Sequence, residues 1–275
     1  MQQRHSTTQM PCSVRPLGPV DYATPVAWWG WSEEPPVAMT ITELVAARDL
    51  DARTAALAWL VLAGHGSVLI AAQQPHSGKT TLLTALLDLV PERIARVYLR
   101  GGAETFEFLQ RASPRRTLLL ANELSAHLPV YLWGVKAVRS FHALRDGYAI
   151  GATLHADSAG EAIAQLRDEL GADPRDLACI DLLIVMRERR VRTVHRLRDA
   201  RSALVRLDGA EWAHDRAAET SLVAERHGIA VTAAERAIAT RAGRIAALVG
   251  EGALSNEAAT RYLAPLNDRN EGEHA

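Results

Sequence analysis

The chain has 275 residues, of which 31 are basic, 32 are acidic and 48% are hydrophobic. This composition excludes a wholly disordered chain, and the formal net charge of -1 excludes a global field that would attract nucleic acid or anionic lipid. No specific nucleic-acid partner is therefore expected. A chain of this length buries enough surface for one large core and a small appendage, but not for three full domains.

The cysteine pattern and the apolar segments indicate a protein of the reducing cytosol. Cys12 and Cys179 lie far apart and belong to no Cys/His cluster, so these cysteines predict neither a disulfide framework nor a zinc site. Residues 1–20 lack the apolar run of a signal peptide. The apolar stretch from Ala55 to Ala72 is interrupted by residues 64–67, which favours a buried helix followed by a buried strand over a membrane span.

Residues 1–38 show no sustained periodicity and predict an irregular N-terminal arm. The arm carries Trp28, Trp29 and Trp31, which are too apolar for a free tail. We expect these tryptophans to pack on the domain that follows, with a partner protein as the less favoured alternative.

Residues 39–200 predict the main α/β core. A capping box at Thr40 begins a short helix that ends near Asp49, and Asp51 caps a second helix that ends at Gly64. Short apolar strands then alternate with helices, which is typical of βαβ units in a mostly parallel sheet. The predicted order is strand 67–72, helix 79–90, strand 94–99, helix 104–111, strand 117–121, helix 130–144, strand 149–154, helix 159–170, and a hairpin of 180–186 and 191–197 at the edge of the sheet.

Residues 201–275 predict a small hairpin and a C-terminal helical subdomain. The hairpin turns near Asp208-Gly209. The Ala-rich helices that follow are expected at 216–227, 233–249 and 256–264.

The segment from Ala72 to Thr81, AQQPHSGKTT, has the pattern of a phosphate-binding loop, because it follows a buried strand and leads into an apolar helix. Backbone N–H groups at such a helix start hold phosphate oxygens, and Gly78 permits their close approach. Lys79 is placed to bridge the β and γ phosphates, and the Thr80 hydroxyl suits Mg²⁺. The alternative is an SGKT sequence that begins a helix by chance. We expect ATP and Mg²⁺ as cofactors, with Ser77, Gly78, Lys79, Thr80 and Thr81 as the binding residues and Thr80 as the metal ligand.

Polar side chains also follow two further predicted strands. The strand 117–121 leads to Glu123, and the strand 149–154 leads to His155. Because ligands bind at the carboxyl ends of parallel strands, we expect Gly78, Glu123 and His155 to share one rim of the sheet. Glu123 and His155 are the candidate catalytic residues.

Four segments, in order, resemble the ATPases of type II and type IV secretion systems, especially the archaeal-type and tight-adherence-pilus branch. They are SGKTT, LLLANEL, GYAIGATLHADSAGEAIAQL and IDLLIVMRERRVRTVHRL, and the resemblance covers about residues 40–200. It implies a RecA-like P-loop core, a homo-oligomeric ring, and ATP hydrolysis that drives pilus assembly or secretion. It also implies a membrane platform protein as partner and a cytoplasmic location, with peripheral placement at the inner face of the cytoplasmic membrane.

By this resemblance, Glu123 matches the glutamate of the second nucleotide motif and His155 matches the histidine that senses the γ-phosphate. The chain also departs from the family. Gln73 replaces a glycine, where its side chain is expected to crowd the loop, and residues 96–102 have no carboxylate where the family has an acidic pair. The nearest carboxylate is Glu104. Asn122 replaces a glycine, the arginine that usually follows the glutamate is missing, and the family's large N-terminal domain is reduced to the arm.

Two functions stay open after these departures. The first is a motor ATPase that hydrolyses ATP slowly. The second is a degenerate subunit that does not hydrolyse ATP and acts as a scaffold beside a full-length secretion ATPase. A small-molecule kinase is disfavoured because no second substrate site is visible. Eight arginines in residues 187–206 suit an acidic partner, lipid headgroups or nucleic acid, but their alternation with apolar residues favours a hairpin with one solvated face.

Overall fold

The computed structural model describes residues 20–25, 28, 38–74, 76–199 and 202–267. An eight-stranded sheet forms its centre, in the order β2-β3-β4-β1-β5-β6-β7-β8. The first five strands of this order are parallel to one another, and β6, β7 and β8 continue the sheet antiparallel. The strands are β1 (Val68–Ala71), β2 (Ala95–Tyr98), β3 (Thr117–Ala121), β4 (Ala149–Leu154), β5 (Leu182–Arg187), β6 (Arg190–Arg196), β7 (Ala203–Asp208) and β8 (Glu211–His214).

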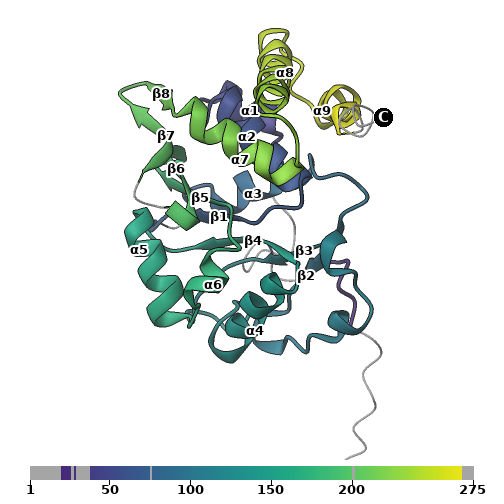
Figure 1. Cartoon of the computed structure of the whole chain (residues 1–275), viewed down its shortest axis with the longest axis vertical. Coiled ribbons are helices and arrows are strands. Elements are labelled where there is room, and N and C mark those ends of the chain that lie inside the picture. Colours follow the sequence, from purple (N-terminus) through teal and green to yellow (C-terminus); the bar gives the residue numbers. More distant parts are fainter. Residues whose placement is uncertain (1–19, 26–27, 29–37, 75, 200–201, 268–275) are drawn as a thin grey trace, which may run out of the picture.

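The central strands are apolar on both sides because helices cover both faces of the sheet (Figure 1). Along β1, Val68 and Ile70 pack into one apolar cluster and Leu69 and Ala71 into the other. One face is covered by α1 (Ile41–Ala46), α2 (Ala52–Ala63), α3 (Lys79–Leu87) and α7 (Arg216–His227). Outside these helices, α8 (Val231–Gly250) packs on α1, α2 and α7, and α9 (Asn256–Leu263) packs on α8. The other face is covered by α4 (Gly134–Arg145), α5 (Ala159–Ala164) and α6 (Pro174–Leu177).

The predicted α/β class and the mostly parallel sheet are confirmed. The strands at 117–121 and 149–154 have the predicted bounds, and the other predicted strands differ by a few residues at their ends. The predicted helix 159–170 consists of α5 followed by a π-helical turn over Gln165–Glu169.

Two predictions are wrong, one about the edge of the sheet and one about a helix. The hairpin of β5 and β6 does not lie at the edge, because β7 and β8 extend the sheet beyond it. Residues 104–111 form no α-helix; they contain a 3-10 turn at Glu107–Gln110. The reason is the side chain of Glu104, which accepts hydrogen bonds from the N–H groups of Arg100 and Phe106 and so favours a tight turn, with Phe106 at φ +63°.

The described part of the N-terminal arm packs on the domain, as predicted for its tryptophans. Trp28 is buried, stands edge-on to Tyr98 and donates its indole N–H to the hydroxyl of Thr84 on α3. Trp29 and Trp31 lie outside the described residues.

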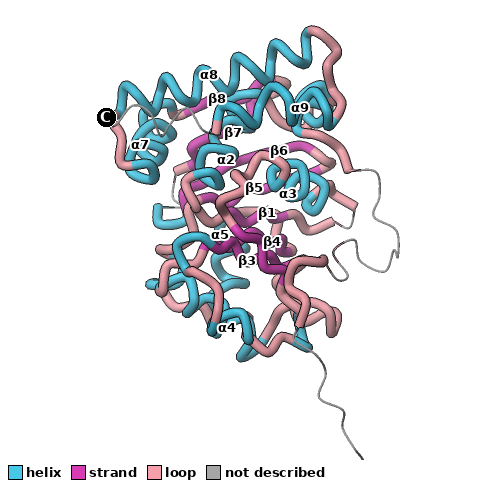
Figure 2. Tube along the Cα trace, turned by 90° about the vertical axis from the view of Figure 1, so that its right-hand side faces the viewer, coloured by secondary structure: helices cyan, strands magenta, loops and turns pink. Residues whose placement is uncertain are grey.

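The C-terminal helices share a core with the helix that precedes β1. Figure 2 shows α8 running across the top of the molecule, above α2 and α7. Ile238 and Ile245 of α8 belong to the same buried cluster as Leu57 of α2. Charged groups join the same elements, because Arg53 of α2 pairs with Glu219 of α7 and with Glu235 of α8, each at 2.7 Å. The proposed boundaries at residues 38 and 200 stay predictions.

Candidate functional site

The loop between β1 and α3 ends in an uncapped helix start. Gly78 is the N-cap of α3 and has φ +89°, a left-handed conformation that favours glycine. No side chain of the described residues caps the helix, so its first N–H groups can bind a ligand at the positive end of the helix dipole. The hydroxyl of Ser77 is buried and has no hydrogen-bond partner among the described residues.

Lys79 is the first residue of α3 and is 8% exposed. Its Nζ donates to the carbonyl of Ala72 at 3.0 Å and lies 3.4 Å from Nδ1 of His155. Burial lowers the pKa of the Lys79 ammonium, and the negative charge of Glu123 opposes that shift. Thr80 and Thr81 follow in the first turn of the helix and are partly buried.

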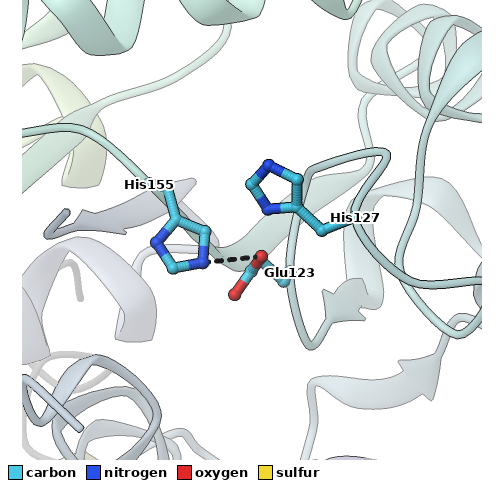
Figure 3. A group of neighbouring side chains, drawn as sticks. All are labelled: Glu123, His127 and His155. Carbon is cyan, nitrogen blue, oxygen red and sulfur yellow. Dashed lines mark ion pairs between the residues drawn. The ribbon is translucent and has the colours of Figure 1, made fainter. Parts of the chain in front are cut away.

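Glu123 and His155 form a pair across two neighbouring strands (Figure 3). Nε2 of His155 lies 2.9 Å from Oε1 of Glu123, which also accepts a hydrogen bond from the hydroxyl of Ser125 at 2.9 Å. The hydrogen bond to Glu123 raises the pKa of His155. Burial opposes ionisation of Glu123, but the contacts with His155, Ser125 and Lys79 outweigh burial and lower the pKa of this carboxyl.

The sheet order explains why these residues meet. The strand β4 lies between β1 and β3, so His155 stands between the loop that carries Lys79 and the end of β3 that leads to Glu123. This placement agrees with the expectation that the phosphate loop shares one rim of the sheet with Glu123 and His155. The hydroxyl of Thr153 donates to the carbonyl of Asn122, which fixes the two strand ends to each other.

Two residues at which the chain departs from the family pattern have defined places. The Gln73 side chain is exposed, so it does not pack into the loop as expected; its carbonyl lies 3.1 Å from Nδ1 of His155. Glu104 is 3% exposed and accepts from Tyr22 as well as from the two backbone N–H groups named above. Its carboxylate therefore stabilises the turn after β2.

His127, which lies in the loop between β3 and α4, was not predicted from the sequence as a residue of the site. Suitable ligand atoms of Glu123, His127 and His155 all lie within 4.8 Å of one another. The rings of His127 and His155 are 5.5 Å apart between centroids. In the sequence, only its position four residues after Glu123 indicates that His127 could join the site. Loop residues have no regular periodicity, so their spacing does not predict which way a side chain points.

The arginine-rich segment forms ion pairs within the chain. Arg196 and Arg198 pair with Glu225 of α7, and Arg192 pairs with Glu188. These contacts agree with the interpretation of a structural hairpin.

No known protein-family model matches the chain, and no curated protein has a significantly similar sequence. Within the described residues, no helix is both long and apolar enough to cross a membrane.

Proposed function

We propose that the chain has a RecA-like P-loop core that binds ATP with Mg²⁺ between the loop 73–81 and the pair of Glu123 and His155. The observation that supports this most is the convergence on one rim of the Lys79 ammonium, an ionised carboxylate and an open helix start. The Ser77 hydroxyl, which has no partner in the described part of the chain, fits a phosphate oxygen, because a buried hydroxyl without a partner is costly.

Each residue has a defined task in this proposal. The N–H groups of the first turn of α3 and the hydroxyl of Ser77 hold phosphate oxygens. Lys79 leaves the carbonyl of Ala72 and binds between the β and γ phosphates. Thr80 offers its hydroxyl to Mg²⁺, and Thr81 continues the loop into the helix. Bound Mg²⁺ would neutralise charge on the phosphate oxygens.

The pair at the end of the neighbouring strands acts on the terminal phosphate. Glu123 is ionised at neutral pH and accepts a hydrogen bond from the attacking water, which it orients. His155, whose pKa is raised, carries a proton toward the γ-phosphate and registers its presence. Hydrolysis is slow, because Glu104, the acid nearest to the end of β2, is engaged in its own turn.

The cellular role that we propose is that of a motor ATPase of a type II/IV secretion or type IV pilus assembly system. It acts in the cytoplasm, next to a platform protein at the inner face of the membrane, as a ring or together with a full-length secretion ATPase. This step rests on the motif resemblance alone.

A second candidate is a subunit that binds nucleotide without hydrolysing it and serves as a scaffold for an active paralogue. The engagement of Glu104 in local structure favours it. Light scattering separates the modes of assembly: a ring gives ATP-dependent self-association, whereas a scaffold gives a complex only after the paralogue is added. A chain that stays monomeric under both conditions contradicts both.

The sequence supplies a matched control for the test of nucleotide binding, because Lys79 and Lys136 are its only lysines. Lys136 lies in α4 and donates to the carbonyl of Gly102. Calorimetric titration with ATP and Mg²⁺ should give saturable heat for the wild type and for Lys136→Ala, and none for Lys79→Ala. Wild-type protein that binds no nucleotide contradicts the proposal, as does equal binding by both variants.

A further inference from the structure

Glu123, His127 and His155 form a group that the proposed ATP site does not fully use, because His127 has no task in it. The group contains two imidazoles and one carboxylate, which is a ligand set of zinc sites that keep one coordination position open. The side chains come from the end of β3, from the loop after it and from the end of β4 (Figure 3).

The geometry of the group suits a small tetrahedral ion. Two ligands bonded to zinc at about 2.0–2.1 Å in a tetrahedral site lie about 3.3 Å apart. Nε2 of His155 and Oε1 of Glu123 are 2.9 Å apart, which is a hydrogen-bond distance, and they need to separate by only about 0.4 Å to bind one ion together. His127 is exposed and can rotate, and its nearest ring nitrogen already lies within 4.8 Å of both other ligand atoms.

The groups around these ligands resemble the outer shell of a metal site. A histidine that binds a metal through one ring nitrogen commonly donates its other N–H to a carbonyl or a carboxylate. Nδ1 of His155 lies 3.1 Å from the carbonyl of Gln73, which fits that arrangement and leaves Nε2 for the metal. The hydroxyl of Ser125 donates to Glu123 and accepts from the backbone N–H of His127, so it ties two ligands together.

We infer that Glu123, His127 and His155 bind one transition-metal dication of the zinc class. The ion replaces the proton shared between His155 and Glu123, and a water or a phosphate oxygen takes the fourth position. Lys79 lies on the Nδ1 side of His155, so its ammonium approaches the ring from the side opposite the metal.

A second group of possible ligands, His142, Asp173 and Asp176, is a weaker candidate. Arg145 already pairs with both of its carboxylates, at 3.2 Å and 3.1 Å. The two aspartates also accept N–H groups at the start of α6. A metal there would have to displace an arginine and a helix cap, so His142 provides the matched control.

The metal site is inferred from geometry and stands without the proposed function, but the two share residues. A metal held by Glu123 and His155 removes both from the tasks proposed for them in hydrolysis. Zn²⁺ should therefore inhibit any ATPase activity, and His127→Ala should relieve that inhibition.

The test uses the full chain, stripped of metal and without nucleotide, titrated with Co²⁺ and followed by visible absorption. The wild type and His142→Ala should bind one Co²⁺, with the intense absorption of a four- or five-coordinate ion, and Zn²⁺ should displace it. His127→Ala should weaken Co²⁺ binding by about 10- to 100-fold, and Ser125→Ala should weaken it by about tenfold. Unfolding curves in urea establish that the variants fold.

The inference would be overturned by no Co²⁺ binding by the wild type, by equal binding by His127→Ala, or by an equal loss in His142→Ala. An intense sulfur-to-cobalt charge-transfer band would place the ion on a cysteine and would overturn it as well. Because these measurements contain no ATP, their failure leaves the proposed function untouched, and a chain without ATPase activity can still bind the metal.

Discussion

His214 and Asp51 are joined by a contact of 2.8 Å between Nε2 of the imidazole and Oδ2 of the carboxylate, although 163 positions separate them in the chain. The other ring nitrogen of His214 faces the wholly buried carboxylate of Glu219 at 2.5 Å. An imidazole with a carboxylate at each nitrogen is held in its doubly protonated form. It links β8 to α2 and α7.

This arrangement predicts a loss of stability at alkaline pH. Burial lowers the pKa of His214, but the hydrogen bonds with Asp51 and Glu219 outweigh it and raise the pKa from 6.5 to about 9. A pKa that is higher in the folded state stabilises the fold fully below about pH 6.5, and this contribution is lost as the pH rises through about 9. We expect His214→Gln to lower the free energy of unfolding by about 2 kcal/mol near neutral pH.

Urea unfolding at a series of pH values checks this. The difference between the wild type and His214→Gln should shrink as the pH rises through about 9. The exposed control Asn256→Ala removes no titratable group and should show no such trend. A difference that is constant with pH would show that the imidazolium does not stabilise the fold.

Substitution of Glu123 tests the proposed catalytic pair. Glu123→Gln keeps the size of the side chain and removes the charge that orients water, so turnover should fall by about 10²-fold or more. ATP affinity should change by no more than about threefold, because the proposed phosphate contacts come from the loop and not from Glu123. Wild-type turnover should itself lie below the median enzyme value of about 10 per second. Steady-state hydrolysis assays and binding titrations measure these quantities, and unchanged turnover in the variant would remove Glu123 from the mechanism.

The side chain of Asn267 fixes the end of the described chain to the core. Its Oδ1 accepts from the indole N–H of Trp59 at 2.9 Å, and its Nδ2 donates to the carbonyl of Leu89 at 3.1 Å. Asn267→Ala leaves both buried groups without this partner and should cost about 1–3 kcal/mol of stability. The exposed Asn256→Ala should change stability by less than about 0.5 kcal/mol. Equal unfolding midpoints for the two variants would contradict this.

Replacing glycine by alanine is expected to change the stability of the fold in opposite directions at two positions. Gly101 has φ +53°, and a Cβ there would collide with the carbonyl of Val130, so Gly101→Ala should destabilise the fold by more than about 3 kcal/mol. Gly243 lies inside α8 with no atom near its Cβ position, so Gly243→Ala should stabilise the fold by about 0.5–1 kcal/mol. Thermal unfolding of both variants tests the pair, and a shift of the same sign in both would refute it.

The sequence was sufficient to predict the parallel part of the sheet, because strands that are buried on both faces appear as continuous apolar runs such as 117–121. The prediction that Gly78, Glu123 and His155 share one rim followed from the rule that the carboxyl ends of parallel strands meet at one edge of the sheet. The extension of the sheet by β7 and β8 did not follow, because these strands are partly exposed and carry no such run.

The position of His127 depends on contacts that spacing cannot reveal. The loop that carries it is closed by the pairing of Leu124 with Leu132. Within it, the hydroxyl of Ser125 receives the backbone N–H of His127. Neither contact has a local sequence pattern. The absence of a helix over 104–111 is a similar case, because it depends on the side chain of Glu104, which binds the backbone on both sides of itself.

The packing of α8 on α2 has a consequence for the order in which the protein folds during synthesis. The ribosome completes α2 more than 160 residues before it releases residues 231–250, so the apolar side of α2 lacks its final cover for most of translation. The nascent chain therefore exposes leucine side chains that a holding chaperone can bind. The apolar side of α2 is fully buried only after α8 has been synthesised. A truncated chain released before this helix is made therefore leaves that side exposed and is prone to aggregate.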